Sequence, residues 1–304
     1  MTLTMTPTST PSERPPTVIY VMGAGRSGST VLGVALGNCA DVFYAGELED
    51  WLKRSGAPNF GGAERARFWD SVRRSVGGEE LYGDEPWRKL EYSLSPLRVH
   101  EWRARRRLRP RYRRVTKRLY GAIASQAHAA HVVDTSHYPL RARELQQLHG
   151  VNLYLIYLIR DPSSVVASFG RRDITNLAKS ILATNAYLCL THLLSVIVFN
   201  RHRTDRRLLL RYEDLIAEPE RVLRQILDWA GVPAELPDLK SLATGIPFQG
   251  NRFLDSEVIA LQSDSAATSR SRSRGSWVTR VLQLPWAIIL PRMGPKATTS
   301  ALGN

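Results

Sequence analysis

The sequence predicts an α/β fold with a central parallel sheet. Short β-branched and apolar segments alternate along the chain with longer segments of helical pattern, and this alternation is typical of parallel sheets. One short segment, 151–159 (VNLYLIYLI), is apolar almost throughout, as expected of a central strand covered on both faces. The chain has 304 residues, of which 43% are hydrophobic, so we expect one domain with a sizeable core.

The predicted elements follow from composition and from the positions of glycine and proline. The predicted strands are the short apolar segments 17–22, 42–45, 131–133, 151–159 and 207–212. The predicted helices are 29–36, 47–54 and 139–148, with two more that begin at Pro162 and Pro219. Proline favours the first helical position because its missing N–H would have no acceptor there.

A long polar segment of helical character separates the second predicted strand from the third. We therefore expect a helical insertion at about 50–130, with breaks at Pro86, Pro96 and Pro110.

The two ends of the chain differ in composition from the predicted domain, 17–262. Residues 1–16 are rich in Thr and Pro and lack the apolar stretch of a secretory signal, so we expect a flexible tail. Residues 263–304 begin with a stretch rich in Ser and Arg, where we expect a low-complexity loop followed by a C-terminal segment.

The formal net charge is +14, and much of it lies in the segment 98–118. This basic run contains eleven Arg or Lys residues and one acidic residue, Glu101. It indicates contact with a polyanion, an anionic membrane surface or nucleic acid, or else a solvated helix face. Only Trp102 and Tyr112 interrupt it as aromatic residues. We therefore expect no nucleic acid, and keep peripheral membrane contact as an interpretation.

The segment 181–199 is long and mostly apolar, but four polar residues are spaced through it. They are Thr184, Asn185, Thr191 and His192. Because such groups are costly in hydrocarbon, we expect a buried core helix.

The two cysteines, Cys39 and Cys189, lie far apart and predict neither a disulfide nor a zinc site. A cytoplasmic protein, with the possibility of contact at the inner face of the membrane, is the expectation.

A glycine-rich loop follows the first predicted strand, with the sequence GAGRSGST at 23–30. Its three glycines match the GxGxxG fingerprint of dinucleotide-binding folds. That fold needs an acidic residue at the end of the second strand. Glu47 and Glu49 lie at about the right distance but after the strand, so the match is poor.

The same loop has the glycine spacing of a P-loop, and Thr30 stands where a Mg²⁺-binding hydroxyl would be. Ser29 occupies the lysine position, however. The charge that reaches the terminal phosphates is therefore missing, and an ordinary nucleotide kinase is not favoured.

A third interpretation keeps the loop as an anion site that needs no metal. Backbone N–H groups at a helix N-terminus bind any tetrahedral anion. The loop adds a guanidinium and hydroxyl groups to them. Its candidate binding residues are Gly25, Arg26, Ser27, Gly28, Ser29 and Thr30.

A second candidate anion site begins where the strand 151–159 ends. Arg160 follows the strand directly, and Ser168 lies eight residues further on. Because parallel strands deliver their carboxyl ends to one edge of the sheet, Arg160 is expected near the glycine loop. Two anion sites on one edge suit a nucleotide that is phosphorylated at both ends.

Together these segments resemble the sulfotransferase family, in particular its bacterial and carbohydrate-type branches. GAGRSGSTVL resembles the family's 5′-phosphosulfate loop, and LIRDPSSVVASF its 3′-phosphate segment. RYEDLIAEPERVLRQILDWAGV resembles the segment whose tyrosine, here Tyr212, approaches the adenine. FQGNRF resembles the loop that closes over the 3′-phosphate, which makes Gly250, Asn251 and Arg252 candidates. The resemblance implies a three-layer P-loop-like fold, and 3′-phosphoadenosine-5′-phosphosulfate (PAPS) as co-substrate without a metal.

Sulfuryl transfer needs a base for the acceptor hydroxyl and positive charge at the leaving phosphate oxygen. Arg26 takes the second role, for which many relatives have lysine. Two residues compete for the first. Glu47 follows the second strand, where several family members have a glutamate base. His137 stands in a Thr-Ser-His-Tyr-Pro context similar to that of a catalytic histidine in cytosolic relatives. We favour Glu47.

The predicted activity is therefore PAPS-dependent sulfuryl transfer to a hydroxyl group of a carbohydrate, a glycolipid or another small molecule. Two alternatives remain, a P-loop nucleotide phosphotransferase and a non-catalytic nucleotide-binding module. The first lacks the loop lysine. The second would not need Arg26 together with a candidate base.

Overall fold

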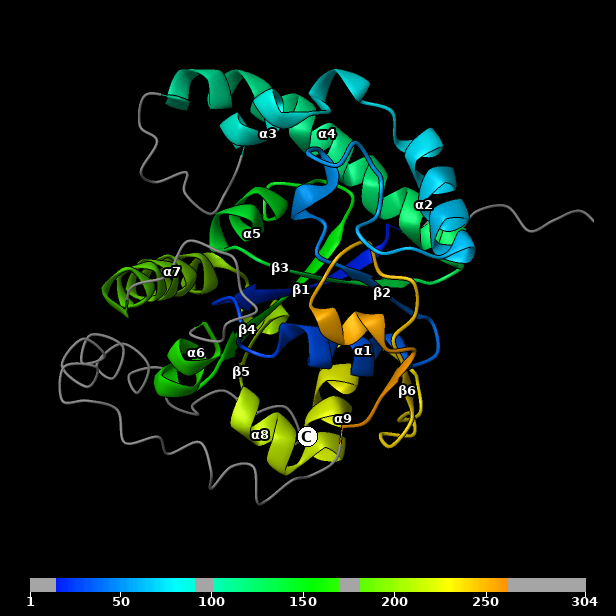
Figure 1. Ribbon diagram of the computed structural model, residues 1–304, viewed down its shortest axis with the longest axis vertical. Coiled ribbons are helices and arrows are strands. Elements are labelled where there is room, and N and C mark those ends of the chain that lie inside the picture. Colours follow the sequence, from blue (N-terminus) through cyan, green and yellow to red (C-terminus); the bar gives the residue numbers. More distant parts are fainter. Residues whose placement is uncertain (1–14, 91–100, 170–180, 262–304) are drawn as a thin grey trace, which may run out of the picture.

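The computed structural model describes residues 15–90, 101–169 and 181–261. In this part of the chain, five parallel strands form a sheet in the order β2-β3-β1-β4-β5 (Figure 1). They are β1 (Thr17–Gly23), β2 (Val42–Gly46), β3 (His131–His137), β4 (Asn152–Ile159) and β5 (Arg207–Arg211). A small antiparallel pair, β6 (Leu242–Ala243) and β7 (Val258–Ile259), lies apart from this sheet. The predicted α/β fold with a central parallel sheet is confirmed.

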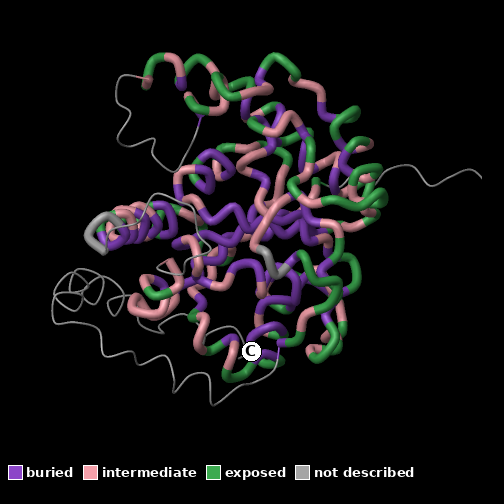
Figure 2. The backbone as a smooth tube through the Cα atoms, viewed as in Figure 1, coloured by how far each residue is buried: buried purple, intermediate pink, exposed green. Residues whose placement is uncertain are grey.

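Helices cover both faces of the sheet and make three layers. Alternate residues of β1 pack into two separate clusters, with Tyr20 and Met22 in one and Ile19 and Val21 in the other. The second cluster joins the sheet to α1 (Ser29–Gly37), α8 (Tyr212–Ala217) and α9 (Pro219–Ala230). Figure 2 shows the buried residues concentrated in the strands and in the helix sides that face them.

The opposite face carries α5 (Pro139–Leu145), α7 (Ile181–Arg201) and helices of the segment between β2 and β3. That segment contains α2 (Ala63–Val76), α3 (Asp84–Leu90) and the 26-residue α4 (Trp102–Ala127). A helical insertion therefore separates the second and third strands, as expected. Residues 91–100, which include Pro96 and the start of the basic run, lie outside the described part.

The predicted proline breaks were wrong where the structure describes them. Pro110 lies inside α4. Its ring is exposed, so the carbonyl that loses its partner can bind water, while Tyr112, Val115 and Leu119 pack against the core on the other side. Pro86 lies in the first turn of α3, where a missing N–H removes no intrahelical bond.

Three predicted boundaries also differ from the structure. The helix expected over 47–54 is reduced to a short 3-10 turn, η1 (Glu49–Trp51), and α5 ends at Leu145. β3 is longer than predicted, so His137 is its last residue rather than part of the following loop. The apolar segment 181–199 does form a helix, α7, which buries Leu188 and Val198 but exposes Leu193 and Ile197. Among the described helices, none is long and apolar enough to cross a membrane.

Candidate functional site

The loop between β1 and α1 lies at the edge where the parallel strands end. The chain turns after Gly23, and the N–H of Ser27 donates to the carbonyl of Ala24 at 3.3 Å. Gly28 then precedes α1 in a left-handed conformation with φ of 98°. A Cβ atom at Gly28 would lie 2.2 Å from the ring of Tyr212, so only glycine fits. The first amides of α1, which have no intrahelical acceptor, face this loop.

The two predicted anion-binding segments lie in contact with each other. Nε of Arg26 donates to Oγ of Ser168 at 3.1 Å. Nη1 of Arg160 donates to the carbonyl oxygen of Arg26 at 3.2 Å. The guanidinium of Arg160 also lies 4.4 Å from the ring centroid of Tyr212. The structure thus brings four of the candidate residues together around the loop.

The position of Arg160 is fixed by the start of α6 (Pro162–Phe169). Asp161 caps this helix, because its Oδ2 accepts from the N–H of Ser164 at 2.9 Å. The N–H of Asp161 in turn donates to Oε1 of Glu213 at 2.7 Å. Arg160 is therefore held between the end of β4 and α8.

The loop hydroxyls differ in their surroundings. Ser27, Ser29 and Thr30 are all buried. Thr30 hydrogen-bonds to the side chain of Tyr44. Oγ of Ser27 is buried and finds no hydrogen-bond partner among the described residues. A buried hydroxyl group costs free energy unless it forms a hydrogen bond with another group.

Glu47 lies where β2 ends, beside the same loop. Its N–H donates to the carbonyl oxygen of Gln249 at 2.8 Å. Burial raises the pKa of Glu47 to about 7; the charges of Asp50 and Asp134 raise it as well, and Arg26 lowers it. The carboxylate therefore exchanges its proton near neutral pH and feels the charge of Arg26.

His137 approaches the loop from the neighbouring strand. Its backbone is left-handed, with φ of 53°, and its Nε2 would lie 3.7 Å from a Cβ atom at Gly25. Burial lowers the pKa of His137 to about 4, although a backbone hydrogen bond with Thr135 and the charge of Asp134 oppose the shift. The imidazole is therefore neutral at pH 7 and is a weaker base than Glu47.

Sequence reasoning missed two residues beside the loop, Tyr187 and Phe169. The hydroxyl of Tyr187, on α7, hydrogen-bonds with the backbone of Gly25 and with the side chain of Thr191. Phe169 packs against the same tyrosine, with ring centroids 6.1 Å apart. The signal in the sequence was that Tyr187 and Thr191 lie four positions apart, on the same side of a mostly apolar helix.

The third candidate segment lies on the Glu47 side of the loop. The N–H of Phe248 donates to the carbonyl of Ala45 at 2.9 Å, and a Cβ atom at Gly250 would lie 3.5 Å from the hydroxyl oxygen of Tyr44. Asn251 accepts from the N–H of Leu254 at 2.9 Å. Arg252 begins η6 (Arg252–Asp255), and its side chain lies outside the described part. Among the described residues, no hydrogen bond joins this segment to Arg160 or Ser168.

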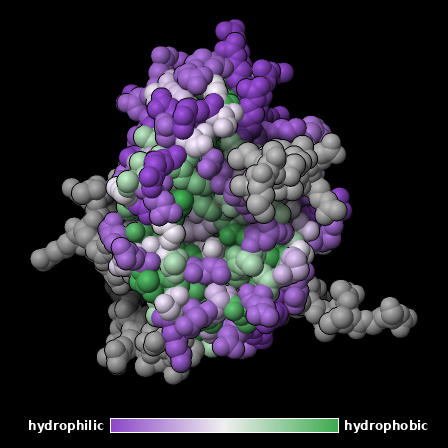
Figure 3. All heavy atoms as spheres, turned by 90° about the vertical axis from the view of Figure 1, so that its right-hand side faces the viewer, coloured by the Kyte–Doolittle hydropathy of each residue, from purple (hydrophilic) through white to green (hydrophobic). Residues whose placement is uncertain are grey.

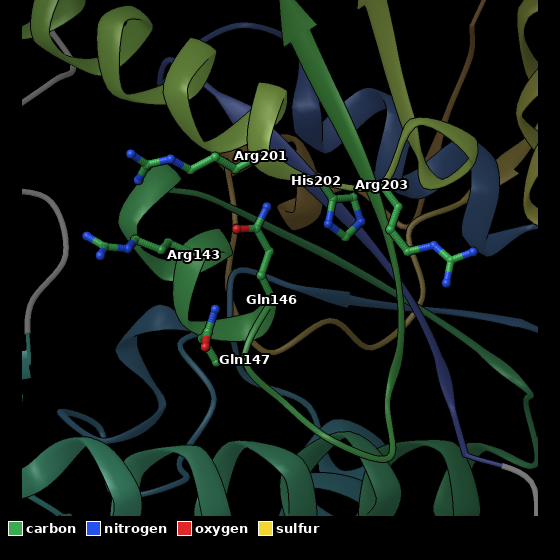
Figure 4. A pocket seen from close by; sticks show the side chains of 6 residues that line it. All are labelled: Arg143, Gln146, Gln147, Arg201, His202 and Arg203. Carbon is green, nitrogen blue, oxygen red and sulfur yellow. The ribbon is translucent and has the colours of Figure 1, made fainter.

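A cavity of about 360 Å³ lies away from the loop. It is lined by Arg143, Gln146, Gln147, Arg201, His202 and Arg203 (Figure 4). It lies at the carboxyl ends of α5 and α7, from which the chain leads to the beginnings of β4 and β5. Cations are favourable at helix carboxyl ends, which accounts for the arginines gathered there. The side chain of Arg203 points away from the other labelled side chains (Figure 4) and pairs with Asp205 at 2.8 Å. This cavity is therefore not part of the candidate site.

Within the described ranges, no group of three or more His, Cys, Asp or Glu could hold a metal ion.

Comparisons with known proteins agree with the fold described above. A model described as the sulfotransferase family matches residues 16–236. One similar solved structure is the sulfotransferase domain from the curacin biosynthetic pathway, at 18% identity and a TM-score of 0.54, over 90% of this chain and 99% of that chain. Another is the sulfotransferase domain of the Synechococcus PCC 7002 olefin synthase, at 18% identity and a TM-score of 0.52, over 93% and 98%. At these identities the similarity shows the fold. No curated protein matches the chain.

Proposed function

Since the chain belongs to the sulfotransferase family, we propose that it transfers the sulfuryl group of PAPS to a hydroxyl group of an acceptor. The observation that carries this proposal is the contact between Arg26 and the pair Arg160 and Ser168. Two segments that we expect to bind anions, each following a separate strand, meet in one place there. A donor that has a phosphosulfate at one end and a phosphate at the other requires such an arrangement.

Residues of the described site suit each part of this donor. The amides at the start of α1, with Arg26 and the loop hydroxyls, would hold the 5′-phosphosulfate. The unsatisfied Oγ of Ser27 supports this assignment. Arg160 and Ser168 would hold the 3′-phosphate, with the segment 250–252 closing over it, and Tyr212 would contact the adenine. Among the described residues no carboxylate pairs with Arg160, so its charge remains available to a phosphate.

The transfer itself is a displacement at sulfur. The acceptor oxygen forms a bond to sulfur, and the bond between sulfur and the 5′-phosphate oxygen breaks. The phosphate leaves as part of 3′-phosphoadenosine-5′-phosphate (PAP), and the charge that grows on its oxygen is stabilised by Arg26. Glu47 accepts the hydroxyl proton, and His137 contacts the acceptor or the transferred group.

The acceptor belongs to the class of carbohydrates, glycolipids or small hydroxyl-bearing metabolites in this proposal. Tyr187, Phe169 and His137 surround Gly25, and they would present aromatic rings and neutral polar groups to such an acceptor. Uncharged hydroxyl compounds suit these surroundings.

The outer face of α4 is the proposed surface for peripheral contact with an anionic membrane. Seven basic residues of this helix are exposed: Arg103, Arg106, Arg107, Arg111, Arg114, Lys117 and Arg118. Their spacing of three and four places them along one side of a helix about 39 Å long, and α4 contains no acidic residue. Figure 3 shows hydrophilic residues covering the end of the molecule that the insertion helices form. We place the enzyme in the cytoplasm, with this helix at the inner face of the membrane.

Vesicle co-sedimentation tests the membrane contact. Changing Arg103, Arg107, Arg111 and Arg114 to Gln should lower partitioning onto vesicles with anionic lipid by two orders of magnitude or more, at about 1 kcal/mol for each charge. The control changes the equally exposed Arg143, Arg201, Arg211 and Arg224 to Gln, which alters net charge by the same amount. Equal losses for the two variants would show an effect of net charge, and no membrane surface on α4.

The activity is tested with PAPS labelled with ³⁵S and a panel of hydroxyl acceptors. We expect labelled product and PAP from the wild type, and far less of both from Arg26→Ala. Phosphate transfer from ATP with Mg²⁺ would instead support a kinase. Tight PAP binding without transfer to any acceptor would support a binding module.

A further inference from the structure

Two buried residues of β3 lie directly behind the turn that carries Glu47. Ser136 and Asp134 both have an exposed fraction of 0%. The N–H of Leu48 donates to Oγ of Ser136 at 2.9 Å. The same hydroxyl donates to Oδ1 of Asp134, which also accepts from the N–H of Ser136 at 2.8 Å. The turn after β2 is thereby tied to β3 through a side chain.

The backbone around Glu47 is consequently held from two sides. The N–H of Glu47 donates to Gln249 at 2.8 Å, and the next N–H, that of Leu48, donates to Ser136. The ladder between β2 and β3 ends with Gly46 beside Asp134, so no further backbone pairing holds the turn to β3. Of the two hydrogen bonds, the one to Ser136 is the bond that joins Glu47 to the strand of His137.

Asp134 is itself fixed by two helices. Its Oδ2 accepts from the hydroxyl of Tyr120 at 2.5 Å and from Nη2 of Arg141 at 3.0 Å. Arg141 also donates to Tyr112 at 2.5 Å and to Tyr120 at 3.3 Å. A buried ion pair contributes little net stability compared with apolar packing, because desolvation offsets its attraction. A network with every oxygen of the carboxylate engaged can instead fix geometry.

We propose that Ser136, held by Asp134, is a positioning residue that fixes the carboxylate of Glu47 for proton transfer. This proposal rests on the proposed function, in which Glu47 is the base. Its physical reason is the steep dependence of proton transfer on distance, since displacement by about 1 Å can lower a rate about 100-fold.

The electrostatic surroundings of Glu47 agree with this role. The groups that interact with its charge come from β2, η1, β3, the loop after β3, the glycine loop and α7. They are Tyr44, Glu49, Asp50, Asp134, Tyr138, Arg26 and Tyr187. Burial and Asp50 raise the pKa of Glu47, and Asp134 raises it further, so the residue that holds Ser136 also contributes to the proton affinity of the base.

The test begins with Ser136→Ala in the full chain. We expect kcat to fall about 10-fold or more, with little change in the KM for PAPS, because Ser136 is fully buried behind the turn and not exposed to a bound donor. Ser136→Thr keeps the hydroxyl and should restore most of the activity. The control is Ser195→Ala, which removes an equally buried hydroxyl from α7 and should leave kcat unchanged. The acid limb of the pH–rate profile of Ser136→Ala should move to lower pH, as water reaches the loosened carboxylate and lowers its pKa.

A double-mutant cycle with Glu47→Gln decides between the explanations. If Ser136 acts through Glu47, Ser136→Ala should lower kcat in the wild type and have no further effect in Glu47→Gln. Equal losses in both backgrounds, with Glu47→Gln itself strongly impaired, would overturn the positioning role and leave the base in place. An active Glu47→Gln would instead remove Glu47 as base, and the positioning role with it. Unchanged thermal unfolding of Ser136→Ala would separate these effects from a loss of fold.

Discussion

Nε of Arg26 lies 3.1 Å from Oγ of Ser168, although 142 positions separate the two residues in the sequence. One belongs to the loop after β1 and the other to the last turn of α6. In the proposed reaction they hold opposite ends of the donor nucleotide. Their contact brings the two candidate donor-binding segments together at the edge where the parallel strands end.

Arg26→Ala should lower turnover far more than it weakens binding of PAP. The charge of Arg26 matters most when negative charge develops on the leaving oxygen, and a loss of about 3 kcal/mol or more is the scale for such a group. Steady-state kinetics and calorimetric titration measure the two effects separately. A raised Michaelis constant with unchanged kcat would show that Arg26 only binds the donor.

Arg160→Ala and Ser168→Ala should weaken binding of PAP but barely alter binding of adenosine 5′-phosphate. Both residues are assigned to the 3′-phosphate, which the second ligand lacks, and charge-assisted hydrogen bonds to phosphate are strong. Arg201→Ala is the control, because this arginine is exposed at the far end of α7. Equal losses for both ligands would mean that Arg160 and Ser168 support the structure of the site.

The pH dependence of kcat should reveal which group is the base. The pKa of Glu47 is raised to about 7 and that of His137 is lowered to about 4, which reverses the order of ordinary carboxyl and imidazole groups. A base must be deprotonated, so a Glu47 mechanism predicts activity that rises as pH increases through about 7. Glu47→Gln should remove most turnover, and His137→Ala should act mainly on acceptor affinity. An acid limb near pH 4, with an active Glu47→Gln, would exchange the two roles.

Stability should fall at mildly acidic pH because His192 is buried without charge. Burial lowers the pKa of His192 from 6.5 to about 4, and its Nδ1 lies 2.5 Å from the hydroxyl of Tyr157. Below pH 6.5 the unfolded chain therefore binds a proton that the folded chain does not, and the free energy of unfolding decreases as pH falls towards 4. Between pH 7.5 and pH 5 this group accounts for about 2 kcal/mol. Urea unfolding at the two pH values should show a smaller decrease for His192→Gln, and an equal decrease would contradict the assignment.

Much of the architecture could be predicted from the sequence because it depends on local patterns. The apolar segment of β4 and the prolines that begin α6 and α9 mark elements directly. The glycine loop could be recognised from its glycine spacing. That spacing has a structural reason at Gly28, where no other residue fits beside the ring of Tyr212.

Other features depend on contacts between distant segments and could not be predicted. The contact of Tyr187 with Gly25 requires that α7 lie beside the loop. The opposite pKa shifts of Glu47 and His137 arise mainly from burial, which raises the pKa of the carboxyl group and lowers that of the imidazole; the carboxylates nearby add to the shift of Glu47 and oppose that of His137. Pro110 remains within α4 because tertiary packing of the helix outweighs its local cost.

The central claim is that one site, formed by the glycine loop and the segment after β4, binds a nucleotide phosphorylated at both ends and needs no metal to do so. Calorimetric titration of the full chain with PAP in the presence of EDTA tests it most directly. We predict one binding site per chain, with an affinity that Mg²⁺ does not change, because the guanidinium groups and the start of α1 supply the positive field. Binding of ATP that requires Mg²⁺, with no binding of PAP, would contradict the claim and support a phosphotransferase.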